Sequence, residues 1–405
     1  MPFAIALSGL NAASADLEIT ANNIANVNTN GFKESRAQFA EVFAVGTQSV
    51  GSNASGSGVR LSKVAQQFTQ GNIDFTDNAL DLAIGGEGFF VLSDGGARAY
   101  TRSGAFGVDN EGNVVNADGA RLQAYPSAGN GLFNTGTPAD LRLTTGANPP
   151  QATTTATFGL NLPADAPLPI NPVFDPTDPS SFNHTTSVTV YDSLGAAHTA
   201  TVFFVKDAAA NTWNTNFEID GTAVGGTSQI VFGTNGSLST PAGGNMVINP
   251  YTPTTGAADI NMTLNFGTAT QFGGAFGVNS LSQDGFTTGR LTGVSVDPEG
   301  VVFARFTNGQ SLSLGKLAMA NFVNPQGLQE LGDTNWAESF QSGDALLGEA
   351  GTASFGNIQS GALEASNVDL TAQLVRVITA QRNFQANAQI IEAADTVTQT
   401  VINIR

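Results

Sequence analysis

The sequence predicts a mainly β protein with an α-helix at each end and with one β domain nested inside another. Three observations support this prediction. Apolar residues near both ends recur at alternating spacings of four and three residues. The middle consists of short apolar runs between Gly- and Asp-rich turns, and two β-type segments of similar composition lie far apart in the chain. We expect the two helices to form a coiled-coil-like axial domain.

The N-terminal helix is predicted from a heptad-like seam that follows Pro2, a residue suited to the first turn of a helix. This stretch is nearly free of charge, with only Asp16 and Glu18 before the end of the pattern. Asparagines and a glycine then end the helix, which places the helical part at residues 1–30. The apolar seam positions are Phe3, Leu7, Leu10, Leu17 and Ile24, with Ser14 and Ala21 between them.

The C-terminal helix is predicted over residues 361–405, because this segment has no proline and no glycine after Gly361. Fully helical, it would be about 65 Å long. It repeats the spacing of the N-terminal seam, although polar residues interrupt it. Its apolar positions are Leu363, Leu370, Leu374, Val377, Phe384, Ala388, Ile391 and Ile402.

Neither terminal helix has a broad apolar face, and isolated helices of this quality are marginally stable in water. We therefore expect the two ends to pair with each other and with other copies of the chain. The alternative is that both helices pack only on the globular body of their own chain.

The middle of the chain reads as short strands, because Asp-Gly, Glu-Gly and Asn-Gly pairs separate its apolar runs. A first β domain is placed at residues 71–145 and 284–324. An inserted outer β domain occupies residues 146–283, and its proline-rich opening indicates irregular, extended chain. Residues 31–70 and 325–360 are expected to be extended connectors between the helices and the β domain.

The charge balance disfavours several classes of partner. Only 12% of the residues are charged and the formal net charge is −18, so binding to nucleic acid or to an anionic membrane is not expected. A surface with so little charge is typical of proteins that cover one another in an assembly, with an unusually neutral extracellular protein as the alternative. No stretch approaches the roughly 20 apolar residues of a membrane-spanning helix, and the start of the chain lacks a secretory signal pattern.

No pattern in the sequence indicates a catalytic, cofactor or metal site, so an enzyme is not expected. The chain has no cysteine, which excludes thiolate chemistry and disulfides. His184 and His198 lack acidic or histidine neighbours at ligand spacing and are predicted to be satisfied surface histidines. The glycine-rich segment 85–90 is followed by a strand-like run, which favours a tight β-turn over a phosphate-binding loop.

Several blocks of the sequence resemble the bacterial flagellar rod and hook proteins. The block "SGLNAASADLEITANNIANVNTNGFK" resembles the N-terminal signature of that family, and "ALDLAIGGEGFFVL" resembles its β-domain motif. The block beginning "GALEASNVDLTAQLVRVITAQRNFQANAQ" resembles the C-terminal helix of the family. The length of the chain and the inserted segment "SVTVYDSLGAAHTATVFF" resemble the hook subunits, whereas distal rod proteins are shorter and lack the insertion.

This resemblance implies a structural subunit that self-assembles into a curved, hollow, extracellular tube, which acts as a universal joint between rod and filament in motility. The implied partners are further copies of the chain, the rod and hook–filament junction proteins, the hook cap and the type III export apparatus. Export without a cleaved signal peptide follows from the same resemblance. A secreted β-rich adhesin with a coiled-coil base is the alternative from a different class, but it does not explain two matched terminal helices.

The resemblance also assigns residues to two short motifs. A Phe-x-x-x-Phe element at Phe39 and Phe43 resembles a recognition motif of the export gate, with a plain apolar pair on a short helix as the alternative. The N-terminal family motif consists of Asn22, Asn23, Ala25, Asn26, Thr29, Gly31 and Phe32.

Overall fold

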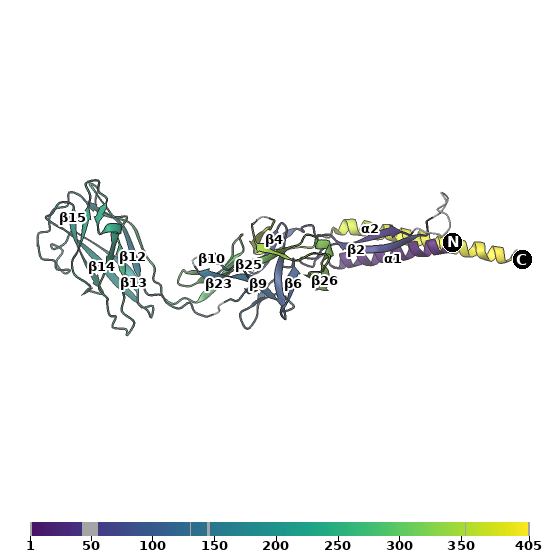
Figure 1. Cartoon of the computed structure of the whole chain (residues 1–405), viewed down its shortest axis with the longest axis horizontal. Coiled ribbons are helices and arrows are strands. Elements are labelled where there is room, and N and C mark those ends of the chain that lie inside the picture. The colour runs from purple at the N-terminus through teal and green to yellow at the C-terminus, as the bar shows by residue number, and fades with distance from the viewer. Residues whose placement is uncertain (1, 43–55, 130, 144–145, 353, 404–405) are drawn as a thin grey trace. The chain divides into compact units, whose positions relative to one another are not determined.

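The computed structural model describes residues 2–42, 56–129, 131–143, 146–352 and 354–403 of the chain (Figure 1). The chain divides into two compact units, which are described separately. Unit 1 consists of residues 1–145, 293–305 and 311–405, and unit 2 consists of residues 146–292 and 306–310. The prediction of a mainly β chain with a helix at each end is confirmed.

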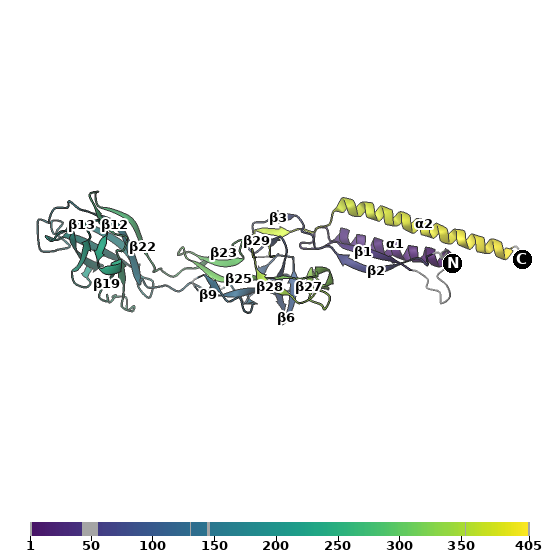
Figure 2. The same ribbon diagram turned by 45° about the horizontal axis from the view of Figure 1, so that its top comes forward.

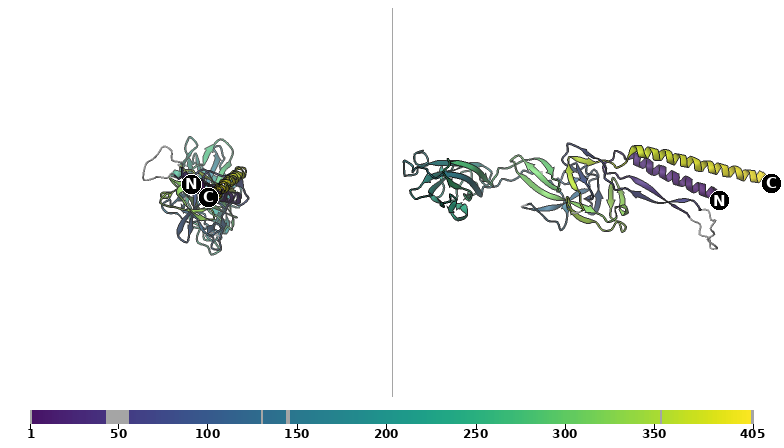
Figure 3. Two further views of the ribbon diagram at one scale, coloured as in Figure 1. Left: turned by 90° about the vertical axis from the view of Figure 1, so that its right-hand side faces the viewer. Right: turned by 90° about the horizontal axis from the view of Figure 1, so that it is seen from above.

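Two long helices of unit 1 pack against each other. Helix α1 (Pro2–Ala25) and helix α2 (Leu370–Asn403) lie side by side in every view (Figures 2 and 3). They run antiparallel, because Asn23 of α1 lies beside Gln373 at the start of α2, whereas Gly9 lies beside Asn387 further along it. No helix in the described part of the chain is long and apolar enough to cross a membrane.

The C-terminal helix starts later than the sequence predicts. Leu363 lies on strand β30 (Ala362–Glu364), which pairs with β3 (Ile73–Phe75), so its assignment to the helix is wrong. The helix begins after Asp369, whose Oδ1 accepts the backbone N–H groups of Thr371 and Ala372 at 2.8 and 3.2 Å. A side chain that satisfies unpaired N–H groups in this way fixes a helix start, whereas a helix pattern alone does not locate it.

A two-stranded antiparallel sheet accompanies α1. Strands β1 (Ser35–Glu41) and β2 (Val59–Gln66) fall within a segment expected to be a simple connector. The backbone N–H of Val59 donates to Ser8 Oγ of α1 at 3.2 Å. A second short pair, β4 (Leu82–Gly85) and β29 (Asn357–Ser360), joins the body of the unit.

The body of unit 1 is a 13-stranded sheet. Three of its strands come from the segment 325–360, which the sequence predicts to be a connector. Trp336 of β27 and Leu347 of β28 pack into the hydrophobic core. The main path runs β23 (Leu291–Val296), β24 (Val301–Phe306), β25 (Ser311–Asn321), β9 (Arg121–Gly129), β5 (Phe89–Asp94), β6 (Ala97–Thr101), β27 (Asn335–Ala337) and β26 (Gln329–Gly332). The remaining strands are β7 (Gly107–Val108), β8 (Val114–Val115), β10 (Leu132–Phe133), β11 (Ala139–Asp140) and β28 (Leu346–Glu349), and η2 (Pro325–Gly327) is a single 3₁₀ turn.

Strand β5 shows how this sheet is buried on both faces. Successive side chains of a strand point to opposite sides. Phe90 and Leu92 accordingly join one hydrophobic cluster, and Phe89 and Val91 join another, which includes Trp336. A continuous apolar run such as "FFVL" is typical of a strand covered on both faces.

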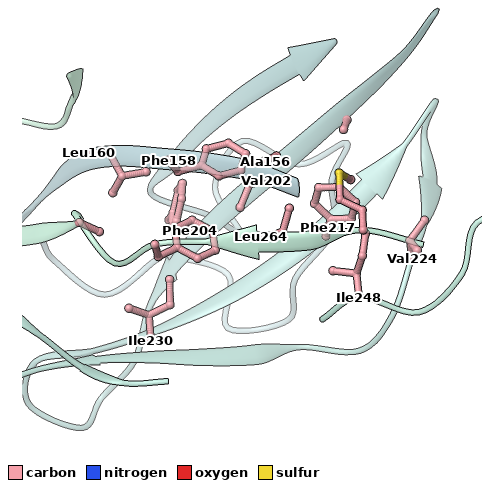
Figure 4. Close-up of a cluster of buried hydrophobic side chains, with 14 of the residues drawn as sticks. Ala156, Phe158, Leu160, Val202, Phe204, Phe217, Val224, Ile230, Ile248 and Leu264 are labelled. Carbon is pink, nitrogen blue, oxygen red and sulfur yellow. The ribbon is translucent and has the colours of Figure 1, made fainter. Parts of the chain in front are cut away.

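Unit 2 consists of two β-sheets around one core. The six-stranded sheet contains β13 (His184–Tyr191), β14 (Ala197–Lys206), β15 (Thr212–Ile219), β16 (Thr222–Ala223), β17 (Ser228–Phe232) and β18 (Leu238–Thr240). The five-stranded sheet contains β12 (Thr155–Pro163), β19 (Asn245–Val247), β20 (Thr263–Asn265), β21 (Thr270–Phe272) and β22 (Gly277–Gln283), and η1 (Ala242–Gly244) precedes β19. Phe158 and Leu264 of one sheet and Val202 and Phe204 of the other lie in one buried cluster (Figure 4).

His198 is not the surface histidine that the sequence predicts, because its side chain is only 6% exposed. Its Nδ1 lies 2.6 Å from Asp220 Oδ2 and its Nε2 lies 3.3 Å from Asp192 Oδ2. Asp220 comes directly after the neighbouring strand β15, and sequence spacing does not reveal that it lies close to His198. His184 is half-buried and stacks on Phe276, with ring centroids 4.4 Å apart.

Candidate assembly interface

The two terminal helices contact each other through small and polar residues. Ala13 of α1 and Ala380 of α2 are buried. A Cβ atom added at Gly9 would lie 2.5 Å from Asn387 Oδ1, so the backbone of α1 closely approaches the side chain of Asn387. Small residues allow two helices to pack at short distance. The buried positions of α1 are Ala6, Ala13, Thr20 and Asn23, and those of α2 are Gln373 and Ala380.

The heptad phase of the contact within the chain therefore differs from the predicted seam of α1 by one residue. Ala6, Ala13 and Thr20 precede the predicted positions Leu7, Ser14 and Ala21 by one residue each. The predicted seam rests on large apolar residues, whereas these positions hold alanine and threonine. The repeat of small residues at the same spacing was the available signal.

Large apolar side chains of both helices instead remain exposed in the single chain. Phe3 of α1 is 53% exposed and Val375 of α2 is 60% exposed. Among the predicted seam positions, Leu7, Leu370, Leu374 and Phe384 are exposed, and Leu10, Leu17, Ile24, Val377 and Ile391 are half-buried. Ile402 lies within α2, and its side chain is not among those described. The seam did not include the exposed residues Ile5, Val375, Ile378, Ile390 and Val397.

The asparagine-rich motif after α1 forms the junction between the helices and the β body. Asn23 is buried, and its side chain forms two hydrogen bonds with the backbone of Ser35 of β1. It donates to the Ser35 carbonyl at 2.8 Å and accepts from the Ser35 N–H at 2.9 Å. Asn26 donates to Asn22 Oδ1 at 2.7 Å and accepts from Thr29 Oγ1 at 3.1 Å. Asn23 thus pairs with the backbone of Ser35, as a buried polar group must, whereas Asn22, Asn26 and Thr29 hydrogen-bond one another at the turn.

Three further motif residues occupy distinct positions at this turn. Ala25 is the last residue of α1 and is exposed, and Phe32 is half-buried. Gly31 has φ +71°, and a Cβ atom there would lie 2.4 Å from the backbone nitrogen of Ser103. Both the left-handed conformation and the close approach require glycine at this position.

A buried ionic cluster, which was not predicted from the sequence, fixes the same junction. Glu364 of β30 accepts hydrogen bonds from Lys33 Nζ at 2.6 Å, from the Gly71 N–H at 2.9 Å and from Arg102 Nη1 at 3.2 Å. Burial lowers the pKa of Lys33, and the charge and hydrogen bond of Glu364 oppose that effect. The cluster joins residues before β1, after β6 and before α2, so it ties both helix ends to the β body.

A groove of about 480 Å³ lies beside this junction within unit 1. Glu18, Ile19 and Asn22 of α1 form one side of it, and Glu330 and Asp333 at the β26–β27 turn form the other. Burial raises the pKa of Glu330. Lys33 also lines the groove, but its Nζ is paired with Glu364. No ion pair in the described part of the chain involves Glu18, Glu330 or Asp333, so these three carboxylates present unpaired negative charge to the groove.

The first phenylalanine of the export-gate motif lies on a strand. Phe39 is exposed on strand β1, opposite Leu61 of β2, which contradicts the alternative of a short helix at this position. Phe43 lies outside the described residues. Among the described residues, no group of His, Asp and Glu side chains is arranged to hold a metal ion.

Sequence profiles of known families match four parts of the chain. They are the flagella basal body rod protein profile at residues 3–33 and the flagellar hook protein FlgE/F/G D1 domain at 83–166. The flagellar basal body protein FlaE D2 domain matches residues 161–286, and the C-terminal profile of the flagellar basal body rod FlgEFG proteins matches residues 359–404.

Full-length relatives decide the family. The flagellar hook protein FlgE of Escherichia coli is 39% identical over 421 residues, which cover 100% of both chains. The chain belongs to the flagellar hook protein FlgE family. The FlgE protein of Borreliella burgdorferi is 32% identical over 435 residues, covering 98% of each chain.

A solved FlgE structure shares the fold. The crystal structure of Helicobacter pylori flagellar hook protein FlgE2 matches with a TM-score of 0.54 and covers 72% of this chain and 100% of that one. The sequence identity is 13%, so this likeness concerns the fold alone.

Proposed function

We propose that this FlgE-family chain is a structural subunit of the bacterial flagellar hook. Many copies assemble into a curved, hollow tube, which acts as a universal joint and transmits torque from the rod to the filament. The relatives that match over the full length are hook proteins, which supports the hook over the shorter distal rod proteins.

One structural observation carries this proposal. The contact between α1 and α2 is already made by small residues, yet large apolar side chains of both helices remain exposed on other faces. Burying one such side chain contributes about 1.5–3 kcal/mol. Packing of Phe3, Leu7, Leu374 and Phe384 against neighbouring copies would therefore stabilise a polymer, since each copy repeats the same contacts.

The proposed setting of the hook determines the other partners. The chain would meet rod proteins at one end of the tube and hook–filament junction proteins at the other, and would assemble beneath a hook cap. It would reach this extracellular position through the type III export apparatus without a cleaved signal peptide. Phe39 is exposed, as a recognition residue for the export gate would have to be.

Deletion of residues 1–25 tests the proposed function. Electron microscopy of the purified full-length chain should show curved, flexible tubes at high protein concentration, and the deletion variant should remain monomeric with folded β-sheets by circular dichroism. Straight, stiff tubes would favour the distal rod. Failure of the intact chain to polymerise, or unimpaired tube formation by the deletion variant, would contradict the proposal.

A further inference from the structure

The helix pair of unit 1 carries few charged residues. Some of them form ion pairs within the chain and others do not. Arg376 of α2 forms an ion pair with Glu34, close to the junction. Arg382 of α2 and Glu18 of α1 are both exposed. Neither side chain forms an ion pair or a hydrogen bond in the described part of the chain.

Arg382 lies on the side of α2 that faces away from α1. With 3.6 residues per turn, Val375, Ile378 and Arg382 lie roughly 140–160° around the helix from Ala380, which is buried against α1. Val375 is 60% exposed and Ile378 is 49% exposed. The single chain therefore presents an apolar surface with one cation beside it.

Glu18 holds the corresponding position on α1. Glu18 and Leu7 are eleven residues apart, which places them on the same side of the helix, and Phe3 lies next to Leu7 on that side. Phe3, Leu7 and Glu18 are all exposed. The outer surface of α1 thus combines apolar residues with one anion, as the complement of the outer surface of α2.

Assembly through these helices would bury both charges among apolar side chains. A charge that is buried without a partner costs far more free energy than a paired one. The inference rests on the proposed function, because only polymer formation buries these surfaces. Arg382 needs an acidic partner on another copy, and Glu18 needs a basic one.

We propose that Arg382 of one copy forms an ion pair with Glu18 of a neighbouring copy. This pair sets the register at which α2 of one copy packs on α1 of the next. The groove beside Glu18, which Ile19 and Asn22 also line, offers space for an arginine side chain. A guanidinium binds a carboxylate through two parallel hydrogen bonds, which fixes orientation as well as distance.

Other acids on the helix pair fit this role less well. Asp16 is half-buried on the inner side of α1. Glu392 and Asp395 lie on α2 itself, so a pair with Arg382 would join α2 to α2 and would not bring the complementary surfaces together. Glu392 is exposed and forms no ion pair in the described part of the chain, which makes it a matched control for Glu18.

The test uses charge reversal in the full-length chain. The variants R382E and E18R should each raise the critical concentration for polymerisation by about tenfold or more, because like charges then meet at every contact. An equimolar mixture of the two variants should polymerise again, since the introduced glutamate of one variant then meets the introduced arginine of the other. The double variant should polymerise alone for the same reason.

The control is R382E mixed with E392R. Only E392R should enter the polymer, because it keeps both Arg382 and Glu18, and R382E should stay in the supernatant. Recovery of polymer in the mixture of R382E and E18R also shows that both variants are folded. An R382E variant with an unchanged critical concentration would refute the ion pair. The ion pair would also be refuted if R382E entered the polymer when mixed with E392R but not when mixed with E18R. In either case tube formation by the unaltered chain would leave the proposed function standing.

Discussion

Glu364 is the residue on which the junction of unit 1 depends most. Its carboxylate is fully buried and accepts hydrogen bonds from Lys33, Gly71 and Arg102. Removing one member of a buried ionic cluster leaves the other charges unpaired in a medium of low dielectric constant. Lys33 is the last residue of the N-terminal family block, but its partner Glu364 lies 331 residues away, and spacing carries no information at that distance.

We expect Glu364→Gln to lower the free energy of unfolding of unit 1 by about 3–5 kcal/mol, because Lys33 and Arg102 lose their counter-charge. Urea denaturation followed by circular dichroism measures this change. The matched control is Glu111→Gln, which removes an exposed ion pair with Arg121 and should cost about 1 kcal/mol or less. Equal losses for the two variants would show that the cluster is not stabilising.

His198 gives unit 2 a dependence on pH. Burial lowers its pKa, but hydrogen bonds and charge from Asp220 and Asp192 outweigh that effect, so the pKa lies above its usual value of 6.5. Both ring nitrogens face carboxylates, and only the imidazolium can donate to both. Burial raises the pKa of Asp192, yet hydrogen bonds from Thr255 and other donors hold it below 3.8.

The sign of the pH effect follows from these directions. A raised histidine pKa contributes stability that is complete below 6.5 and is lost as the pH rises through the folded-state pKa, whereas the lowered aspartate pKa contributes stability that is lost below about 3.8. We therefore expect His198→Gln to destabilise unit 2 by about 1–3 kcal/mol at pH 5.5.

The loss should be smaller at pH 9, because the imidazolium population of the unaltered chain falls as the pH rises. Denaturant titrations that follow the fluorescence of Trp213, in a Trp336→Phe background, report on unit 2. A difference between variant and parent that is the same at both pH values would contradict a charged His198.

At the scale of elements, the two helices show what periodicity can and cannot predict. Heptad spacing predicts both helices, because the apolar periodicity remains detectable even where polar residues occupy some of its positions. It does not show which face the chain covers by itself, since Ala13 and Ala380 contribute little to an apolar pattern and yet are buried. The start of α2 was missed for a related reason, because the cap at Asp369 is a single residue within an otherwise helix-compatible segment.

The helices have an inner face, at the contact between α1 and α2, and an outer face that is exposed in the single chain. Substitutions on these two faces should have different effects. Leu374→Asn alters an exposed residue and should change the stability of the monomer by less than about 0.5 kcal/mol. The same substitution should raise the critical concentration for polymerisation, because the outer apolar surface is then interrupted. Thermal unfolding and sedimentation measure the two quantities.

Ala380→Leu should show the opposite behaviour. It overpacks the buried contact between α1 and α2 and should destabilise the monomer by about 1–3 kcal/mol. If Leu374→Asn unfolded the helices as strongly as Ala380→Leu, the assignment of an outer and an inner face would be wrong.

At the scale of the whole molecule, charge and apolar burial oppose each other during assembly. Each copy carries a formal net charge of −18, so copies repel one another at low ionic strength. The exposed apolar residues of the terminal helices supply the attraction, and hydrophobic attraction is not weakened by moderate salt. The low share of charged residues, 12%, means that few ion pairs contribute to the contacts.

Raising the sodium chloride concentration from about 20 to 150 mM should therefore lower the critical concentration, because the Debye length falls to about 8 Å and the repulsion is screened. Sulfate at equal ionic strength should lower it further, since sulfate strengthens apolar burial. Sedimentation across the salt series measures the effect. A polymer held mainly by exposed ion pairs would respond with the opposite sign. The Arg382–Glu18 pair is compatible with the expected sign, because a buried pair is screened much less than the net charge.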